Sequence, residues 1–319
     1  MITASELYLA RIQTTLGAGE SDLTAADWID CLPESKLDIV PTSDPMKTVS
    51  GRSSQDASVP GLINADIQLD FAIRSAGAAA PPSWANIAQA ARLALTEEEV
   101  GSGTKYILKP SNGHKDVTVW KYGGAHGANK SQLKQAVNCV FDWKISQEVG
   151  KKAIISFQNG KGSLLSLPVS GTLPVIVKPE LYTPALLAAD TISIFGQQYK
   201  LIKYEISGNV PVEQYLDGTS FSGYGQSEAV DTEIKWSMTV YAESPTVVDP
   251  YTAWLNRTTG DINVVYGKTG EKISHNIGDA QIEDIKEGKQ GNITSWDLTG
   301  ISIDNNYTLT VNADLVDEE

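Results

Sequence analysis

Histidine and cysteine are the side chains best suited to nucleophilic or metal-centred chemistry, and this sequence holds few of them. The histidines are His114, His126 and His275, and the cysteines are Cys31 and Cys139. None stands in an H-x-x-x-H or C-x-x-C frame, the spacing that directs two ligands to one metal ion. Only residue type supports a nucleophilic pair of Cys139 and His126. We therefore expect no metal, no cofactor and no enzymatic activity.

Other patterns that can carry chemistry are present only in weak form. Gly123–Gly127 is glycine-rich but lacks the lysine and hydroxyl residue of a phosphate-binding loop, so we interpret it as a surface loop. A glycosidase dyad needs two carboxylates about 5 to 10 Å apart, which no pattern here establishes. Seven tryptophans are enough to line a sugar site. However, Trp84, Trp236 and Trp254 fall at apolar positions of predicted elements, which favours a core role.

Composition narrows the possible partners. The chain has 319 residues, a length typical of two domains, with 41% apolar and 20% charged residues. Its net charge of −14 disfavours nucleic-acid and anionic-membrane binding, because both need basic side chains. No basic segment precedes an apolar run at the start, and no apolar run approaches about 18 residues, so we expect neither a secretory signal nor a membrane span. The two distant cysteines fit unpaired thiols in a reducing compartment.

The clearest local pattern lies at Ile63–Arg74, where apolar and polar residues alternate. This period of two predicts a long strand with one buried and one wet face. A short amphipathic helix is predicted next, with Ser83 as its N-cap and apolar residues recurring from Trp84 to Leu95. The run of glutamates and glycines at 97–103 is expected to end that helix.

The same order of elements returns in the second half. Val230–Val240 alternates like a second half-buried strand. Asp249 before Pro250 is typical of a helix start, with the aspartate as N-cap and the proline at the first helical position.

The spacing between these elements is nearly constant. Leu69 and Trp236 lie 236 − 69 = 167 residues apart, and Lys36–Ile39 precedes Lys203–Ile206 by 203 − 36 = 167. The two helix starts are separated by 249 − 83 = 166. We interpret this as an internal duplication, the alternative being chance recurrence of strand, loop and helix in a β-rich chain.

The duplication predicts two domains, 1–163 and 191–319, each mainly β with a flanking helix. Leu164–Asp190 carries four prolines and is interpreted as an extended linker. Asn112-Gly113, Asn159-Gly160 and Asp217-Gly218 are typical turn signals. Further strands are expected at 116–121, 135–145, 152–158, 261–266, 281–285 and 293–303.

Between about Gly51 and Asn159 the chain resembles the tail tube (major tail) proteins of long-tailed phages of the siphovirus type. The residues that carry the resemblance are Ser50-Gly51-Arg52, Ile63–Arg74, Pro81-Pro82-Ser83-Trp84, Ala90-Ala91, Lys105–Asn112, Asp116–Gly123, Gly127-Ala128-Asn129 and Ala153–Phe157. The pattern covers about a third of the chain and is not a sharp motif. The second half agrees only through the duplication.

The resemblance implies β-sandwich or barrel domains whose sheets join between subunits into the inner barrel of a ring. Rings then stack into a tube through which the genome passes. Side chains on the wet faces of the two predicted strands become candidates for the lumen. They are Asp66, Gln68, Asp70, Glu233 and Lys235.

In this family the loop before the long strand reaches the neighbouring ring. Its equivalents here are 43–58 and 209–227, both rich in Gly, Ser and Asp and without strand periodicity. Candidate residues for contacts between rings are Asp44, Lys47, Arg52, Asp56, Glu213, Asp217 and Tyr224.

The resemblance also implies partners and a location. If both halves adopt the tube fold, three chains form a pseudo-sixfold ring, which we favour over six chains. Other tail proteins (tape measure, terminator and distal tail proteins) and passing duplex DNA are the further partners. The expected locations are the virion and, during assembly, the host cytoplasm.

Two other classes stay open. A minor tail component, such as a distal tail or hub protein, would share the fold. A carbohydrate-binding β-sandwich would instead expose several tryptophans.

Overall fold

The computed structural model describes residues 6–15, 23–24, 27–45, 58–74, 81–100, 103–125, 130–172, 191–242, 249–267 and 272–313. Within them the protein is mainly β, as predicted, with 20 strands and two six-residue helices. The first half contains β1 (Leu7–Ile12), β2 (Trp28–Ile29), β3 (Lys36–Pro45), β4 (Ser58–Ala72), α1 (Ala85–Ala90), β5 (Leu93–Val100), β6 (Gly103–Pro110), β7 (Val117–Ala125), β8 (Lys130–Glu148), β9 (Ile154–Leu164) and β10 (Val169–Thr172). The second contains β11 (Thr191–Ile194), β12 (Gln197–Gln198), β13 (Leu201–Ser207), β14 (Val212–Leu216), β15 (Tyr224–Ala229), β16 (Lys235–Tyr241), α2 (Pro250–Leu255), β17 (Thr259–Tyr266), β18 (Ile273–Gln290), β19 (Ile293–Ser302) and β20 (Tyr307–Ala313).

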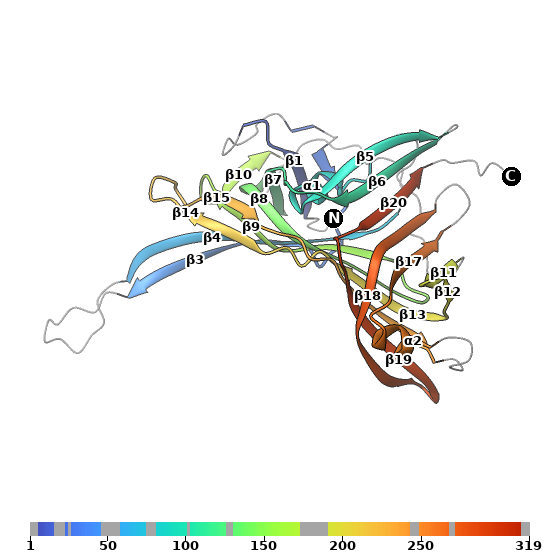
Figure 1. Cartoon of the computed structure of the whole chain (residues 1–319). Helices are drawn as coiled ribbons and strands as arrows, with labels where there is room; N and C mark the ends of the chain where they lie inside the picture. Colours follow the sequence, from blue (N-terminus) through green and yellow to red (C-terminus); the bar gives the residue numbers. More distant parts are fainter. Residues whose placement is uncertain are drawn as a thin grey trace, which may run out of the picture.

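The strand pairings form two sets with the same order. In the first set the order is β3-β4-β9-β8-β7-β1, with β2 beside β1 and β10 beside β8. In the second it is β13-β16-β19-β18-β17-β11, with β12 beside β11 and β20 beside β18. All of these pairs are antiparallel. The helices also hold equivalent places along the chain: α1 lies between β4 and β7, and α2 lies between β16 and β17 (Figure 1).

Each set also has one hairpin that the other lacks among the described residues. The hairpin β5–β6 follows α1 in the first set, and β14–β15 stands between β13 and β16 in the second.

The two sets are joined along one seam. The end of β8 pairs with β13, from Lys203 opposite Glu148 to Ser207 opposite Lys144. As a result β3-β4-β9-β8-β13-β16-β19-β18 form one continuous run of eight strands. A second link pairs β6 with β20.

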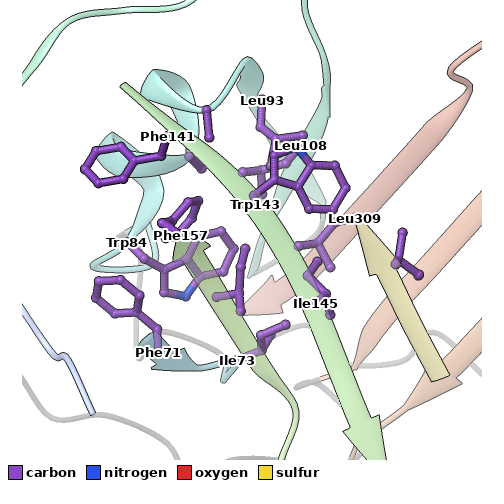
Figure 2. Close-up of a cluster of buried hydrophobic side chains, with 14 of the residues drawn as sticks. Phe71, Ile73, Trp84, Leu93, Leu108, Phe141, Trp143, Ile145, Phe157 and Leu309 are labelled. Carbon is purple, nitrogen blue, oxygen red and sulfur yellow. The ribbon is translucent and has the colours of Figure 1, made fainter. Parts of the chain in front are cut away.

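One hydrophobic core extends through both sets. In the first set Phe157 contacts Phe71 and Phe141 edge to face, at ring-centroid distances of 5.9 and 6.3 Å. Figure 2 shows these rings beside Trp84 and, across the core, Trp143 close to Leu309 of the second set. Burying aromatic side chains of this size supplies much of the apolar stabilisation of such a core.

A pair of glycines fixes which residues correspond between the sets. Ile67 of β4 lies opposite Gly160, and Trp236 of β16 lies opposite Gly300. At both glycines an added Cβ would collide, at 2.5 Å from the Phe141 ring and 2.6 Å from the Trp236 ring. Ile67 and Trp236 thus occupy the same position in their sets, at a spacing of 236 − 67 = 169 residues. The spacing of 167 expected from the sequence, which matched Leu69 with Trp236, is therefore wrong by two residues.

The first helix is shorter than predicted, and its predicted N-cap is wrong. The helix begins at Ala85 with Trp84 as N-cap and no side-chain capping bond. It ends before Arg92, whose φ of 60° turns the chain into β5. The residues from Leu93 onward form β5 because they pair with β6, and the glutamates at 97–99 lie exposed on that strand. The predicted cap of the second helix is confirmed, since Asp249 accepts the amides of Tyr251 and Thr252.

Three other expectations need correction. The second long strand begins at Lys235, because the Asn305 side chain binds Ile234 N and Thr232 O in the segment before it. Trp254 is 46% exposed and is not a core residue. The segment predicted as a linker begins at the last residue of β9 and contains β10, which pairs with β8, while residues 173–190 lie outside the described part.

Candidate assembly surface

The eight-stranded run presents one face rich in polar side chains, called here the polar face. Asp66 and Gln68 lie half-buried on β4, and Lys235 lies exposed on β16. The strand register links β4 to β16 on this face. Across successive strands the opposed pairs are Asp70 and Ser156, Ser156 and Lys144, Lys144 and Ser207, and Ser207 and Lys235. Side chains directly opposite in a sheet share a face, so residues from both halves are brought together here.

Two of the predicted lumen residues differ from the rest. Asp70 is only 7% exposed, because the turn before β3 covers it: Ser35 Oγ accepts Asp70 N at 2.9 Å, and Leu32 N donates to Asp70 O at 2.7 Å. Asp70 is therefore not a solvent-facing residue of this face. Glu233 is exposed but precedes β16, where it pairs with Lys235 at 2.8 Å.

Lysines of the polar face are held by carboxylates. The distances are 2.9 Å for Lys36–Asp66, 2.8 Å for Lys144–Glu205 and 2.8 Å for Lys286–Asp284. The hydrogen bond to Asp66 raises the pKa of Lys36, and the bond from Lys286 lowers the pKa of Asp284. Exposed pairs of this kind contribute at most about 1 kcal/mol each to stability. Their effect here is to mix both signs of charge, so the face offers no continuous cationic track for phosphates.

On the opposite face, the seam between β8 and β13 is closed by a buried aromatic and polar cluster. Trp143 stacks on Tyr307 at a centroid distance of 5.2 Å. The Tyr204 hydroxyl contacts Gln147 Oε1 at 3.1 Å and His275 Nε2 at 3.0 Å. Burial lowers the pKa of His275 to about 3, so the ring is neutral near pH 7.

This cluster is a structural feature that the sequence did not reveal. His275 Nδ1 contacts the Tyr307 hydroxyl at 2.9 Å, and Tyr266 OH lies 3.0 Å from Nε2, so both ring nitrogens are occupied. A neutral, fully bonded histidine is suited to a core and not to acid–base work. The only sequence signal was the alternation of small and large residues along 273–277.

The residues predicted to contact a neighbouring ring fall into two groups. Asp44 lies in β3 opposite Val59, while Lys47, Arg52 and Asp56 lie outside the described residues. Glu213 and Tyr224 lie in the β14–β15 hairpin, and Asp217 lies in its connecting turn, where it accepts the Thr219 amide at 2.8 Å.

The segment 209–227 is therefore not the irregular loop that was expected. Its hairpin packs on the first set: Gln214 Nε2 donates to Gly162 O at 3.1 Å, and Ile63 N donates to Ser222 O at 3.0 Å. The end of the hairpin leaves three large apolar side chains exposed, Tyr215 at 51%, Leu216 at 71% and Phe221 at 53%.

Among the described residues, those considered for chemistry do not form a reactive group. Cys139 is fully buried, and burial raises the pKa of its thiol, which keeps it protonated. Both cysteines are unpaired, and His126 lies outside the described residues. Within the described ranges, no group of three His, Cys, Asp or Glu side chains is placed to hold a metal ion. The helices described there are also too short to cross a membrane.

No protein-family model matches the chain, and a comparison with curated proteins also found no match.

Proposed function

We infer that this protein is a tail tube subunit of a long-tailed phage, and that its copies close into rings that stack around the passing genome. The observation that carries the proposal is the repeated order of strand pairing. It supports a chain built from two copies of one β unit, joined side by side at the seam. A unit that already joins its own copy laterally is suited to continue that joining in a ring.

The size of the continuous sheet supports a ring of three chains. Three copies would contribute 24 strands to one barrel, eight from each chain. With strands about 4.8 Å apart and tilted by about 40°, such a barrel has a backbone diameter of roughly 48 Å. This leaves a bore wider than duplex DNA after the inner side chains are added.

The chemistry of the polar face is compatible with a passage for DNA. Its lysines are paired with carboxylates, and the chain as a whole carries a charge of −14. A wall of this kind does not hold phosphates tightly, so DNA is a transient occupant and not a ligand. Asp66, Gln68 and Lys235 are the lumen residues that we retain.

Stacking of rings has a candidate contact in the β14–β15 hairpin. Tyr215, Leu216 and Phe221 are exposed at its end, and exposed apolar groups of this size commonly mark an interface. We propose that this end of the hairpin is buried, along the tube axis, against the next ring or, at the ends of the tube, against the tail tip or terminator protein. The virion and the cytoplasm of the infected host are the corresponding locations.

Sugar binding has less support. Six of the seven tryptophans are buried, and only Trp254 is exposed. The described residues therefore do not present the several exposed tryptophans that a carbohydrate-binding module was expected to show.

Electron microscopy of the purified protein, concentrated at several salt concentrations, tests the proposal. Rings or hollow tubes with threefold symmetry are the expected result. Persistent monomers under every condition, including addition of preformed tail tips, would contradict it. Copy number in purified virions separates the two tail roles, because a tube subunit is present in many rings and a distal tail or hub protein in few.

A further inference from the structure

The seam inside the chain provides a template for the contact between chains. At the seam, β13 adds to the free edge of β8, with Ser207 opposite Lys144 and Ile206 opposite Ile145. Lys144 also reaches Glu205 across the seam at 2.8 Å. This is β-strand addition, in which backbone bonds give affinity and side chains fix the register.

The strand equivalent to β8 in the second set is β18, and the residues correspond one by one. Asp142 and Asp284 are each the first regularly paired residue after a bulge, opposite Gln158 of β9 and Thr299 of β19. Two residues further along, Lys144 therefore corresponds to Lys286.

The strand equivalent to β13 in the first set is β3. Ile206 lies opposite Trp236, and Leu37 lies opposite Ile67, the residue that matches Trp236. Ile206 thus corresponds to Leu37, and Ser207 corresponds to Asp38.

Each of these strands has one edge without a strand partner among the described residues, and on β3 the Lys134 side chain of the same chain donates to Leu37 O at 3.2 Å. From Asp284 onward β18 pairs only with β19, and β3 pairs only with β4. The difference shows at matched positions: Asp142 is 6% exposed and accepts Val210 N across the seam at 2.9 Å, whereas the Asp284 side chain is 50% exposed.

We propose that β3 of a second copy of this chain adds to the free edge of β18, in the register that places Asp38 opposite Lys286. This inference rests on the proposed function and names the strands, register and ion pair that close the ring. The two charges are complementary, and the side chains are 75% exposed at Lys286 and 54% exposed at Asp38. Within the chain Asp38 lies 3.8 Å from Lys134 Nζ and Lys286 lies 2.8 Å from Asp284, so each would exchange or share its present partner on assembly.

A second copy fits this edge better than an unrelated partner does. Adding β3 to β18 continues the same antiparallel sheet and keeps the polar face on one side. The two edges belong to different surfaces, so the contact is heterologous and repeats until a ring closes. Val40 of β3 is 46% exposed and would lie opposite Asp284 in this register, which supplies apolar area next to the ion pair.

Disulfide trapping tests the register directly. In a D38C/K286C variant the two Cβ atoms would lie about 5 Å apart, within reach of a disulfide after small shifts. Assembled protein oxidised with copper–phenanthroline should give covalent multimers on a non-reducing gel, ending at the number of chains in the ring. Matched controls are each single variant and D38C/K289C, whose second cysteine points to the other face.

Charge exchange gives an independent measurement. Asp38→Lys should raise the critical concentration for assembly about tenfold, because like charges then meet at the interface. Lys286→Glu should do the same, and the double variant should recover assembly.

The outcomes separate the two proposals. If wild-type protein forms no rings, the proposed function fails. If wild-type rings form but D38C/K286C gives only the control level of cross-linking, or if charge exchange leaves assembly unchanged, the strand and register proposed here are wrong. Covalent dimers as the sole product would also overturn it, since they indicate a twofold contact.

Discussion

Strands β8 and β18 occupy the same place in their pairing sets, but their surroundings differ. Along the end of β8 the side chains facing the core are Trp143, Ile145 and Gln147, all buried. The matching end of β18 carries Ile285, Glu287 and Lys289, and the last two are exposed. A strand edge that pairs within the same chain can carry apolar side chains. A strand edge that is exposed in the unassembled protein must instead avoid non-specific pairing with other strands. Charged side chains on a free edge disfavour such pairing.

The two helices show the same contrast. In α1 four of six residues are buried, including Ile87 and Ala88, whereas in α2 only Pro250 is buried. Exposed Leu255 and Trp254 lie on α2, which packs on β18. The second set is thus the less covered of the two, at the end where we place the neighbouring chain.

The largest expected effect concerns the seam. Trp143→Ala should lower the free energy of unfolding by about 3–5 kcal/mol, because it removes a buried indole that stacks on Tyr307. The matched change Ile285→Ala, at a partly buried position of β18, should cost about 1 kcal/mol. Urea denaturation of the unassembled protein measures both. Equal losses would mean that the seam and the free edge are not energetically different.

The matched glycines give the next effect. Gly300→Ala would place a Cβ 1.9 Å from Gln281 O and 2.6 Å from the Trp236 ring, so the strands must move apart. A loss of about 1–3 kcal/mol is expected, and a similar loss for Gly160→Ala. Gly113→Ala is the control, since its Cβ would meet nothing within 4 Å. Unchanged urea midpoints for the first two variants would contradict the close approach in both sets.

A pH dependence distinguishes the second set, where His275 is fully buried. The pKa of His275 is lowered to about 3 in the folded protein by burial, compared with about 6.5 when unfolded. Its neutral form stabilises the fold above pH 6.5, and that contribution is lost as the pH falls toward 3. Between pH 7 and pH 5 this single group should cost about 2 kcal/mol. Urea denaturation across this range should show the loss in wild type and a smaller slope in His275→Gln.

Some of these features were predictable from local sequence and others were not. Alternation predicted β4 and β16 because each has one largely buried face and one more polar face. It missed β5, whose glutamates at 97–99 lie in a strand exposed on both sides. Asn159-Gly160 was interpreted as a turn, but it lies inside β9, where Asn159 has a φ of 52° and Gly160 lies against the Phe141 ring.

The residues of the candidate assembly surface also divide into those that the sequence could predict and those that it could not. Asp66, Gln68 and Lys235 were predictable because a period of two assigns each residue to a face. The burial of Asp70 and the seam between Trp143 and Tyr307 depend on segments far apart in the sequence. No local pattern encodes such contacts, and only the pairing of β8 with β13 brings them together.

The smallest expected effect concerns the N-terminal caps of the two helices, because only α2 has a side-chain cap. Asp249 accepts hydrogen bonds from Tyr251 N at 3.0 Å and Thr252 N at 3.1 Å, so Asp249→Ala should destabilise the start of α2 by removing its capping bonds. Ser83→Ala is the matched change in α1, where no side chain caps the helix, and it should cost almost nothing. Because α2 is largely exposed, global unfolding is an insensitive measure of this change.

Hydrogen exchange of individual amides provides the local measurement. In Asp249→Ala the amides of Tyr251 and Thr252 should exchange about fivefold faster, while those of α1 stay unchanged. The capping bond also depends on charge: hydrogen bonds from Thr252 lower the pKa of Asp249, so protection of these amides should decline only at acidic pH. Equal protection in the variant and the wild type would show that packing on β18, and not the cap, holds the start of α2.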